Sequence, residues 1–178
     1  MGVLALAGYG VHAAYHLWSG GPEDLLWVCH LAAAIVGAGL IAGSKPVVSV
    51  GALILCMGTP LWIFDLAQGS EFMPTSLCTH GLGLALGLWG VWKLGIAAGA
   101  WWKAGLTVLA MIVVSRGITP AASNVNLAFA IPPGMDRYFS SHFVYLAVML
   151  GISCVYMWIV EMLLCRAARA AKPGEVAP

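Results

Sequence analysis

The sequence contains little charge, and this excludes most soluble architectures. Only 8% of its 178 residues are Asp, Glu, Lys or Arg, against about 25% in an ordinary soluble domain. Hydrophobic residues make up 61%, and the mean hydropathy is +0.93. The chain is therefore predicted to be an integral membrane protein. A net charge of +1 argues against nucleic acid as a partner, because binding to phosphates needs clustered positive charge.

The sequence also lacks cysteine pairs and the features of a signal peptide. Its five cysteines lie in or beside apolar stretches and form no CxxC motif. This arrangement predicts neither a disulfide framework nor a zinc finger. The first apolar run has no positive segment before it and contains two histidines, so residues 2–19 are interpreted as a mature membrane span.

Apolar runs of roughly 20 residues predict an all-α polytopic membrane protein. The expected architecture is a bundle of six transmembrane helices in a single domain, 1–178. The connection 119–140 is the only long one, and long irregular loops in compact proteins are often functional. A short polar tail, 166–178, follows the last span. The predicted spans are 2–19, 25–43, 47–67, 75–95, 101–118 and 141–165.

Positive charges orient the predicted bundle, since Lys and Arg concentrate on the cytoplasmic side of a membrane. With both termini in the cytoplasm, only Arg116 and Arg137 lie outside. The sequence therefore predicts a multi-pass protein, of a bacterial cytoplasmic (inner) membrane, with both termini inside. The positive residues on the inner side are then Lys45, Lys93, Lys103, Arg166, Arg169 and Lys172.

Histidine is the most informative residue type that is present. The predicted spans place all five histidines near the outer ends of their helices. An ionisable residue inside a membrane span is costly, and a functional role is its default interpretation. The sequence therefore predicts one polar site near the outer leaflet, closed over by the long loop, with the last histidine at its mouth. The five are His12, His16, His30, His80 and His142.

The histidines suggest two kinds of arrangement. His12 and His16 share a helix face at a spacing that can hold a metal, or they are interfacial side chains wetted by lipid headgroups. His30 and His80 lie deeper, where each needs a polar partner. Asp65 is the expected acidic partner, although a purely structural polar network would satisfy the same requirement.

Three further polar residues have a functional and a structural interpretation. Cys29 can pair with His80 across helices, as a thiolate nucleophile with its general base, or it is an inert buried thiol. Ser76 shares a helix face with His80, or it is a helix cap and nothing more. Glu161 is interpreted as a carboxylate that reaches, or is paired at, the inner interface near Arg166.

Three stretches carry a resemblance to a known family. They are residues 27–31 (WVCHL), 75–80 (TSLCTH) and 124–127 (NVNL), the last followed by two prolines. On these stretches the chain resembles the bacterial YwaF-type integral membrane family. More distantly, it resembles membrane lipid acyltransferases and androgen-induced-type fatty-acyl ester hydrolases. The resemblance covers about residues 25–165.

The resemblance implies a six-span-like bundle that acts on fatty-acyl esters. Cys29 would be the nucleophile and His80 the base, with Asn124 and Asn126 as amides lining the site. The chain departs from that pattern at two places. His30 beside Cys29 makes the nucleophile position ambiguous, and the pair of histidines in the first span has no role in such a scheme.

The leading prediction of function is a lipid acyl hydrolase or acyltransferase at the outer leaflet, with membrane lipids as partners and no cofactor. Cys29 would attack the ester, His80 would manage the proton, and Asp65 would orient His80. An asparagine amide would stabilise the oxyanion. The expected substrate-binding residues are His30, Ser76, Asn124 and Asn126.

Two alternatives use the histidines as ligands, and a third is not enzymatic. His12, His16, His80 and Asp65 can hold zinc with a position left open for water. Histidines at similar depth, His30 and His80, can instead ligate haem from two sides. In the third alternative the chain is a structural or assembly subunit whose histidines form a polar plug.

Overall fold

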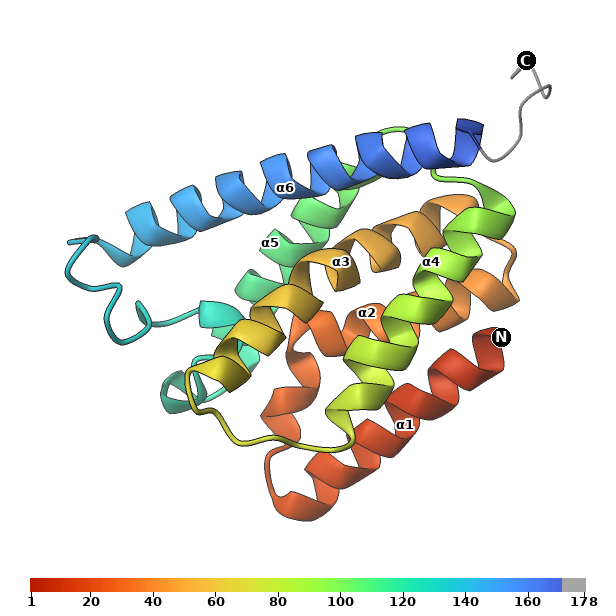
Figure 1. Cartoon of the computed structure of the whole chain (residues 1–178). Helices are drawn as coiled ribbons and strands as arrows, with labels where there is room; N and C mark the ends of the chain where they lie inside the picture. The colour runs from red at the N-terminus through yellow and green to blue at the C-terminus, as the bar shows by residue number, and fades with distance from the viewer. Residues whose placement is uncertain (171–178) are drawn as a thin grey trace.

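The computed structural model describes residues 1–170, and this part of the chain is helical and without β-strands. The prediction of an all-α bundle is confirmed. Each predicted span contains one α-helix, and the ends differ by a few residues except in the fourth span, whose α-helix begins only at Gly83 (Figure 1). The helices are α1 (Gly2–Ser19), α2 (Val28–Ile41), α3 (Lys45–Ala67), α4 (Gly83–Leu94), α5 (Ala100–Ile118) and α6 (His142–Ala170).

The chain is a membrane protein by the length and surface of its helices. Three stretches are long and apolar enough to cross a membrane, namely Lys45–Ala67, Ala100–Ile118 and His142–Ala168, and α2 is a shorter apolar helix. Large apolar side chains point outward, as at Phe143, which is 72% exposed. Such a continuous apolar exterior suits lipid rather than water.

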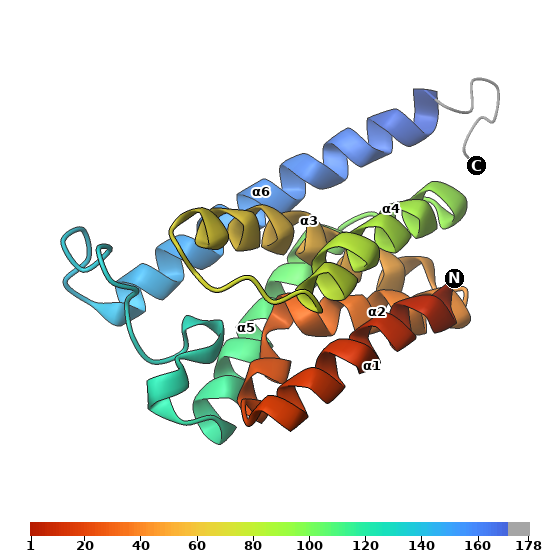
Figure 2. The ribbon, with the colours of Figure 1, turned by 60° about the horizontal axis from the view of Figure 1, so that its bottom comes forward.

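Helices α2 and α3 form the centre of the bundle. Helix α1 packs on α2, and α4 packs on both central helices, whereas α5 and α6 lie on the other side of α3 (Figures 1 and 2). Glycines permit the close approaches that membrane helices use. At Gly58 an added Cβ would lie 2.8 Å from the Cβ of Cys29, and at Gly83 it would lie 2.9 Å from that of Ala33.

The connections divide between the two ends of the bundle. The N-terminus, the turn between α2 and α3 and the connection from α4 to α5 lie at one end (Figures 1 and 2). The 3₁₀ turn Pro22–Leu26, the link from α3 to α4 and the long loop after α5 lie at the other end. The outer ends of the predicted spans therefore meet in space, as the histidine pattern requires.

The approach to α4 differs from the ordinary helix start that the sequence predicts. Residues Leu77–Leu82 form a π-helical turn. Its wider winding redirects backbone carbonyls, and the Thr59 hydroxyl on α3 donates to the carbonyl of His80 at 3.3 Å. Turns of this kind are frequent at functional sites. This one fixes the backbone of His80 against α3.

Candidate metal centre

Four of the five histidines meet in one buried cluster. His12 and His16 come from α1, His30 from the first turn of α2, and His80 from the π-helical turn. The exposed fraction of each is 8% or less. Ring centroids are 4.2 Å apart for His12 and His30, and 5.5 Å apart for His30 and His80. The predicted histidine cluster is thus present.

Helix α1 presents both of its histidines inward because they are one turn apart. His12 and His16 continue a buried stripe that begins with the small residues Gly2, Ala5 and Gly8. Small side chains early in the stripe let α1 approach its neighbours, and the two imidazoles fill the wider space near the end of the helix. The interpretation that headgroups wet this pair is wrong, since both rings are buried.

Hydrogen bonds fix the tautomer of His30. Its Nδ1 lies 2.9 Å from the backbone carbonyl of Asp24 and 3.2 Å from Nε2 of His12. A carbonyl only accepts hydrogen bonds, so Nδ1 carries the proton and the neutral ring has its lone pair on Nε2. A metal-binding histidine is typically held in this way, with one ring N–H donated to a carbonyl.

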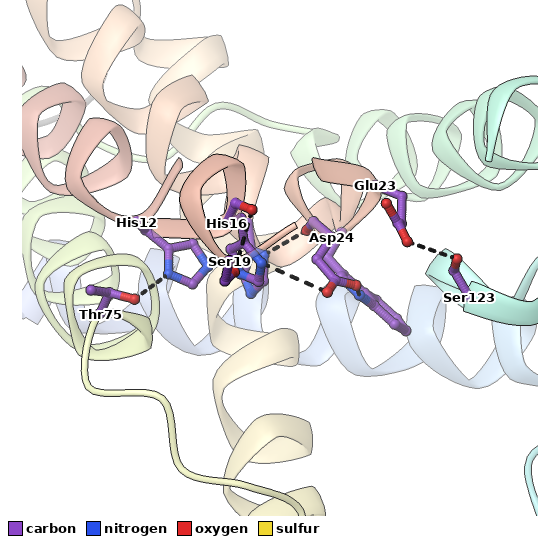
Figure 3. Close-up of polar contacts among 9 residues, drawn as sticks. His12, His16, Ser19, Glu23, Asp24, Thr75 and Ser123 are labelled. Atoms are coloured by element: carbon purple, nitrogen blue, oxygen red, sulfur yellow. Dashed lines mark hydrogen bonds and ion pairs between the residues drawn. The ribbon is translucent and has the colours of Figure 1, made fainter. Parts of the chain in front are cut away.

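The same reasoning extends to His12 and Thr75. Because His30 donates from Nδ1, Nε2 of His12 accepts, and the proton of His12 sits on Nδ1. That nitrogen lies 3.0 Å from the hydroxyl oxygen of Thr75 (Figure 3). Thr75 therefore orients the His12 ring from the segment that leads into the π-helical turn.

Two buried ring nitrogens have no hydrogen-bond partner among the described residues, Nε2 of His16 and Nδ1 of His80. Leaving a buried polar atom unpaired costs about 1–3 kcal/mol, so each such atom calls for an explanation such as a bound ion. The ring of His80 is also stacked parallel to Trp62, with centroids 4.8 Å apart. The stacking fixes the plane of the ring without using the hydrogen-bonding capacity of Nδ1.

Two sets of potential ligand atoms overlap at His30. One set combines His12, His16 and His30, and the other combines Cys29, His30 and His80. Within each set the ligand atoms lie within 4.8 Å of one another. Ligands of a tetrahedral zinc ion are about 3.3–3.8 Å apart, given bonds of roughly 2.0–2.3 Å. Small side-chain rotations would therefore close either set around an ion.

The structure brings together some of the predicted catalytic residues and separates others. Cys29 and His80 share one ligand set, as the sequence predicts. Asp65 does not join them: it lies exposed at the end of α3, and no hydrogen bond or ion pair links it to His80 in the described chain. Ser76 is buried just before the π-helical turn, where its carbonyl accepts from Thr79 at 3.1 Å.

The asparagines of the long loop have structural partners. The Asn124 side-chain oxygen accepts from the backbone of Phe129 and Ala130 and so closes its own loop. The Asn126 oxygen accepts from the backbone N–H of Val28, and its Nδ2 donates to the carbonyl of Leu26 and the hydroxyl of Ser115. For Asn126 the predicted oxyanion role does not agree with this bonding, because both of its N–H groups are already used. Asn124 donates one N–H to the carbonyl of Ala130, and its oxyanion role stays a prediction.

His142 lies apart from the cluster and is bonded differently. Its Nε2 donates to the carbonyl of Leu127 at 3.0 Å, and its ring stacks on Tyr145. Of the two interpretations of Glu161, the structure agrees with pairing rather than snorkelling: the residue is 7% exposed, and its carboxylate accepts from the backbone N–H groups of Gly99 and Trp101 at the start of α5.

Sequence reasoning missed Asp24, Thr75 and Trp62 as members of the site. Asp24 places its carboxylate 3.7 Å from Nδ1 of His16 and its carbonyl on His30. The sequence feature that identifies Asp24 is its position in the short connection between two histidine-bearing helices. Thr75 stands five residues before His80, at the polar opening of the fourth predicted span.

The cluster suits a single ion better than a haem group. The histidine rings contact one another directly, with centroids 4.2–5.8 Å apart. Trp62 covers a face of His80. A planar macrocycle between His30 and His80 would have to separate these packed rings. An ion needs only the lone pairs that are already gathered.

Known proteins provide no separate indication of function. Comparison with protein-family models, with curated proteins and with solved structures finds no match. The resemblance to the YwaF-type family stays a prediction.

Proposed function

We propose that this chain is a membrane-embedded metalloprotein in which Cys29, His30 and His80 hold a divalent ion of the zinc type. The observation that carries the proposal is the set Cys29, His30 and His80, whose ligand atoms lie within 4.8 Å of one another. Nδ1 of His80 is buried and has no hydrogen-bond partner among the described residues. Thiolate and imidazole are the ligands that zinc prefers in proteins.

The number of ligands favours a catalytic centre over a structural one. Structural zinc sites use four protein ligands, whereas catalytic sites use three and leave a position for water or substrate. The proposed set contains one thiol and two imidazoles. Its place in an apolar bundle favours a lipid-soluble substrate. We therefore propose metal-assisted hydrolysis as the reaction class.

Residues around the ligands support this assignment. The carbonyl of Asp24 fixes the tautomer of His30, Trp62 fixes the ring plane of His80, and the Thr59 hydroxyl holds the backbone of His80. Orienting contacts of this kind typically accompany metal ligands.

Metal analysis of the detergent-purified protein tests the proposal. We expect one zinc ion per chain after equilibration with zinc and removal of excess, and a loss of bound zinc in His30→Ala and His80→Ala. His142→Ala is the matched control, because this histidine lies outside the cluster and bonds to a backbone carbonyl. Wild-type protein without stoichiometric zinc, or equal losses in all three variants, would refute the proposal.

A second candidate function follows from the same pair of residues. Cys29 and His80 also form the juxtaposition that thiol acyl chemistry requires, and we keep lipid acyl transfer or hydrolysis as the alternative. This alternative predicts that the wild-type protein turns over a labelled lipid ester. Turnover should be lost in Cys29→Ala and His80→Ala and kept in Cys56→Ala. Loss of turnover on treatment with a metal chelator would instead assign the activity to the metal. Turnover that survives both substitutions would exclude the thiol.

A further inference from the structure

A carboxylate connects the buried cluster to the surface. Oδ2 of Asp24 lies 3.7 Å from Nδ1 of His16 (Figure 3), and the side chain of Asp24 is 40% exposed while that of His16 is 4% exposed. The indole of Trp27 donates to the other carboxylate oxygen at 3.1 Å and holds the group in this position. Asp24 thus presents an oxygen to the outside while it touches the first buried imidazole.

Behind this pair lie two sets of potential ligands that share one residue. His16 has a buried Nε2 without a partner and shares a ligand set with His12 and His30. His30 is also a member of the set that contains Cys29 and His80. A cation bound at His16 therefore lies in a set of ligands that shares His30 with the proposed centre.

The space in front of the pair is kept open by a glycine. A Cβ added at Gly21 would lie 3.1 Å from Oδ2 of Asp24 and 3.7 Å from Nδ1 of His16. The missing side chain leaves both donor atoms approachable.

We infer that Asp24 and His16 form a loading site through which a divalent cation reaches the centre at Cys29 and His80. The inference rests on the proposed function. The negative carboxylate attracts the hydrated ion and replaces one of its waters; imidazole nitrogens then replace further waters. At the end the sulfur of Cys29 binds and releases its proton to solvent. No electron is transferred; apart from the bonds between ligands and the ion, only the S–H bond of Cys29 is broken, and its proton goes to solvent.

Cobalt alone serves as the probe, because thiolate bonded to Co²⁺ gives a near-ultraviolet charge-transfer absorption that reports arrival at Cys29. Metal-free protein in detergent is mixed with Co²⁺ in a stopped-flow instrument. We expect Asp24→Asn to load about tenfold more slowly, the low end of the range for electrostatic steering, and Gly21→Ala to load more slowly through obstruction. Both variants should reach the wild-type final absorbance.

Matched controls exist for both substitutions. Glu23 is the neighbouring carboxylate, but it bonds to the Ser123 hydroxyl at 3.1 Å rather than to a histidine (Figure 3). Gly10 on α1 has nothing within 4 Å of an added Cβ. We expect Glu23→Gln and Gly10→Ala to load at the wild-type rate.

The outcomes separate this inference from the proposed function. Slower loading with an unchanged end point supports the loading site. Wild-type loading rates in Asp24→Asn and Gly21→Ala overturn it and leave the metal centre intact. A reduced end point in both variants also overturns it, since Asp24 would then belong to the centre itself. A wild-type protein without a cobalt–thiolate absorption overturns the proposed function first.

Discussion

At the scale of single residues, His30 has the most constrained role. It is the one side chain that belongs to both ligand sets, and its tautomer is fixed by the carbonyl of Asp24. The other rings depend on contacts that are easier to remove. His12 relies on the Thr75 hydroxyl and His80 on the stacked indole of Trp62. Removal of these supports tests whether the cluster is organised for binding.

Thr75→Val removes the hydroxyl that orients His12 and leaves all proposed ligands in place. We expect zinc affinity to fall by up to about tenfold, the smallest effect typical of losing a partner that bonds a ligand directly, because Thr75 acts on the ligand His30 only through His12. Competition with a chromophoric chelator measures the change. Thr107→Val is the control, because that hydroxyl bonds to the carbonyl of Lys103 within α5. An unchanged affinity in Thr75→Val would mean that His12 has no part in positioning the ligands.

The sequence predicts the histidines of the site better than its acidic partner. The spacing of His12 and His16 specifies a shared helix face, and the depth of His30 and His80 in their spans specifies a common level in the bundle. The sequence favours Asp65 as the acid because it ends a predicted span at the same level. The depth of a residue in the bundle does not determine which way its side chain points. Asp65 is exposed, whereas the carboxylate of Asp24, in the connection between α1 and α2, contacts His16.

At the scale of elements, the long loop anchors the helix that carries two of the proposed ligands. Asn126 joins the loop to the first residue of α2 and to Ser115 on α5. Both Asn124 and Asn126 adopt positive φ, 42° and 54°, a conformation that asparagine tolerates better than most residues. They differ in burial, since Asn126 is 8% exposed.

Asn126→Ala should therefore destabilise the protein more than Asn124→Ala. The buried N–H of Val28 and the carbonyl of Leu26 would lose their partner, at about 1–3 kcal/mol for each unpaired group. Thermal unfolding followed by circular dichroism in detergent measures the difference. Both positions have a positive φ, so the strain that alanine experiences there is present in both variants and cancels in the comparison. Equal losses of stability would contradict the anchoring role of Asn126.

The sequence predicts where helices lie but not how the fourth predicted span begins. Apolar length and the breaks between runs place all six α-helices. The π-helical turn Leu77–Leu82 has a tertiary contact, the hydrogen bond from the Thr59 hydroxyl to the His80 carbonyl, which joins residues far apart in the sequence. An α turn and a π turn use the same residues and differ only in which carbonyl each N–H meets. No local pattern specifies that choice.

At the scale of the whole molecule, the two ends of the bundle have different chemistry. The end with the α2–α3 turn and the α4–α5 connection carries Lys45 and Lys93, and Lys103 begins α5 nearby. The opposite end holds the histidine cluster and the long loop. We propose six spans with both termini in the cytoplasm on the basis of this division.

Reporter fusions test the proposed topology. A fluorescent protein that matures only in the cytoplasm should be active when fused after α6. Alkaline phosphatase, which needs an oxidising compartment, should be active when fused within the loop 119–140 and inactive after α6. The opposite pattern would place the histidine cluster at the cytoplasmic face. Termini on opposite sides of the membrane would mean an odd number of spans.

Zinc-edge X-ray absorption of the purified protein shows whether the thiol and imidazoles of the histidine cluster hold one ion. We expect one sulfur at about 2.3 Å and nitrogens at about 2.0–2.1 Å. We also expect loss of the sulfur signal in Cys29→Ala but not in Cys56→Ala. A zinc environment without sulfur, or one identical in both variants, would contradict the assignment of Cys29 as a ligand.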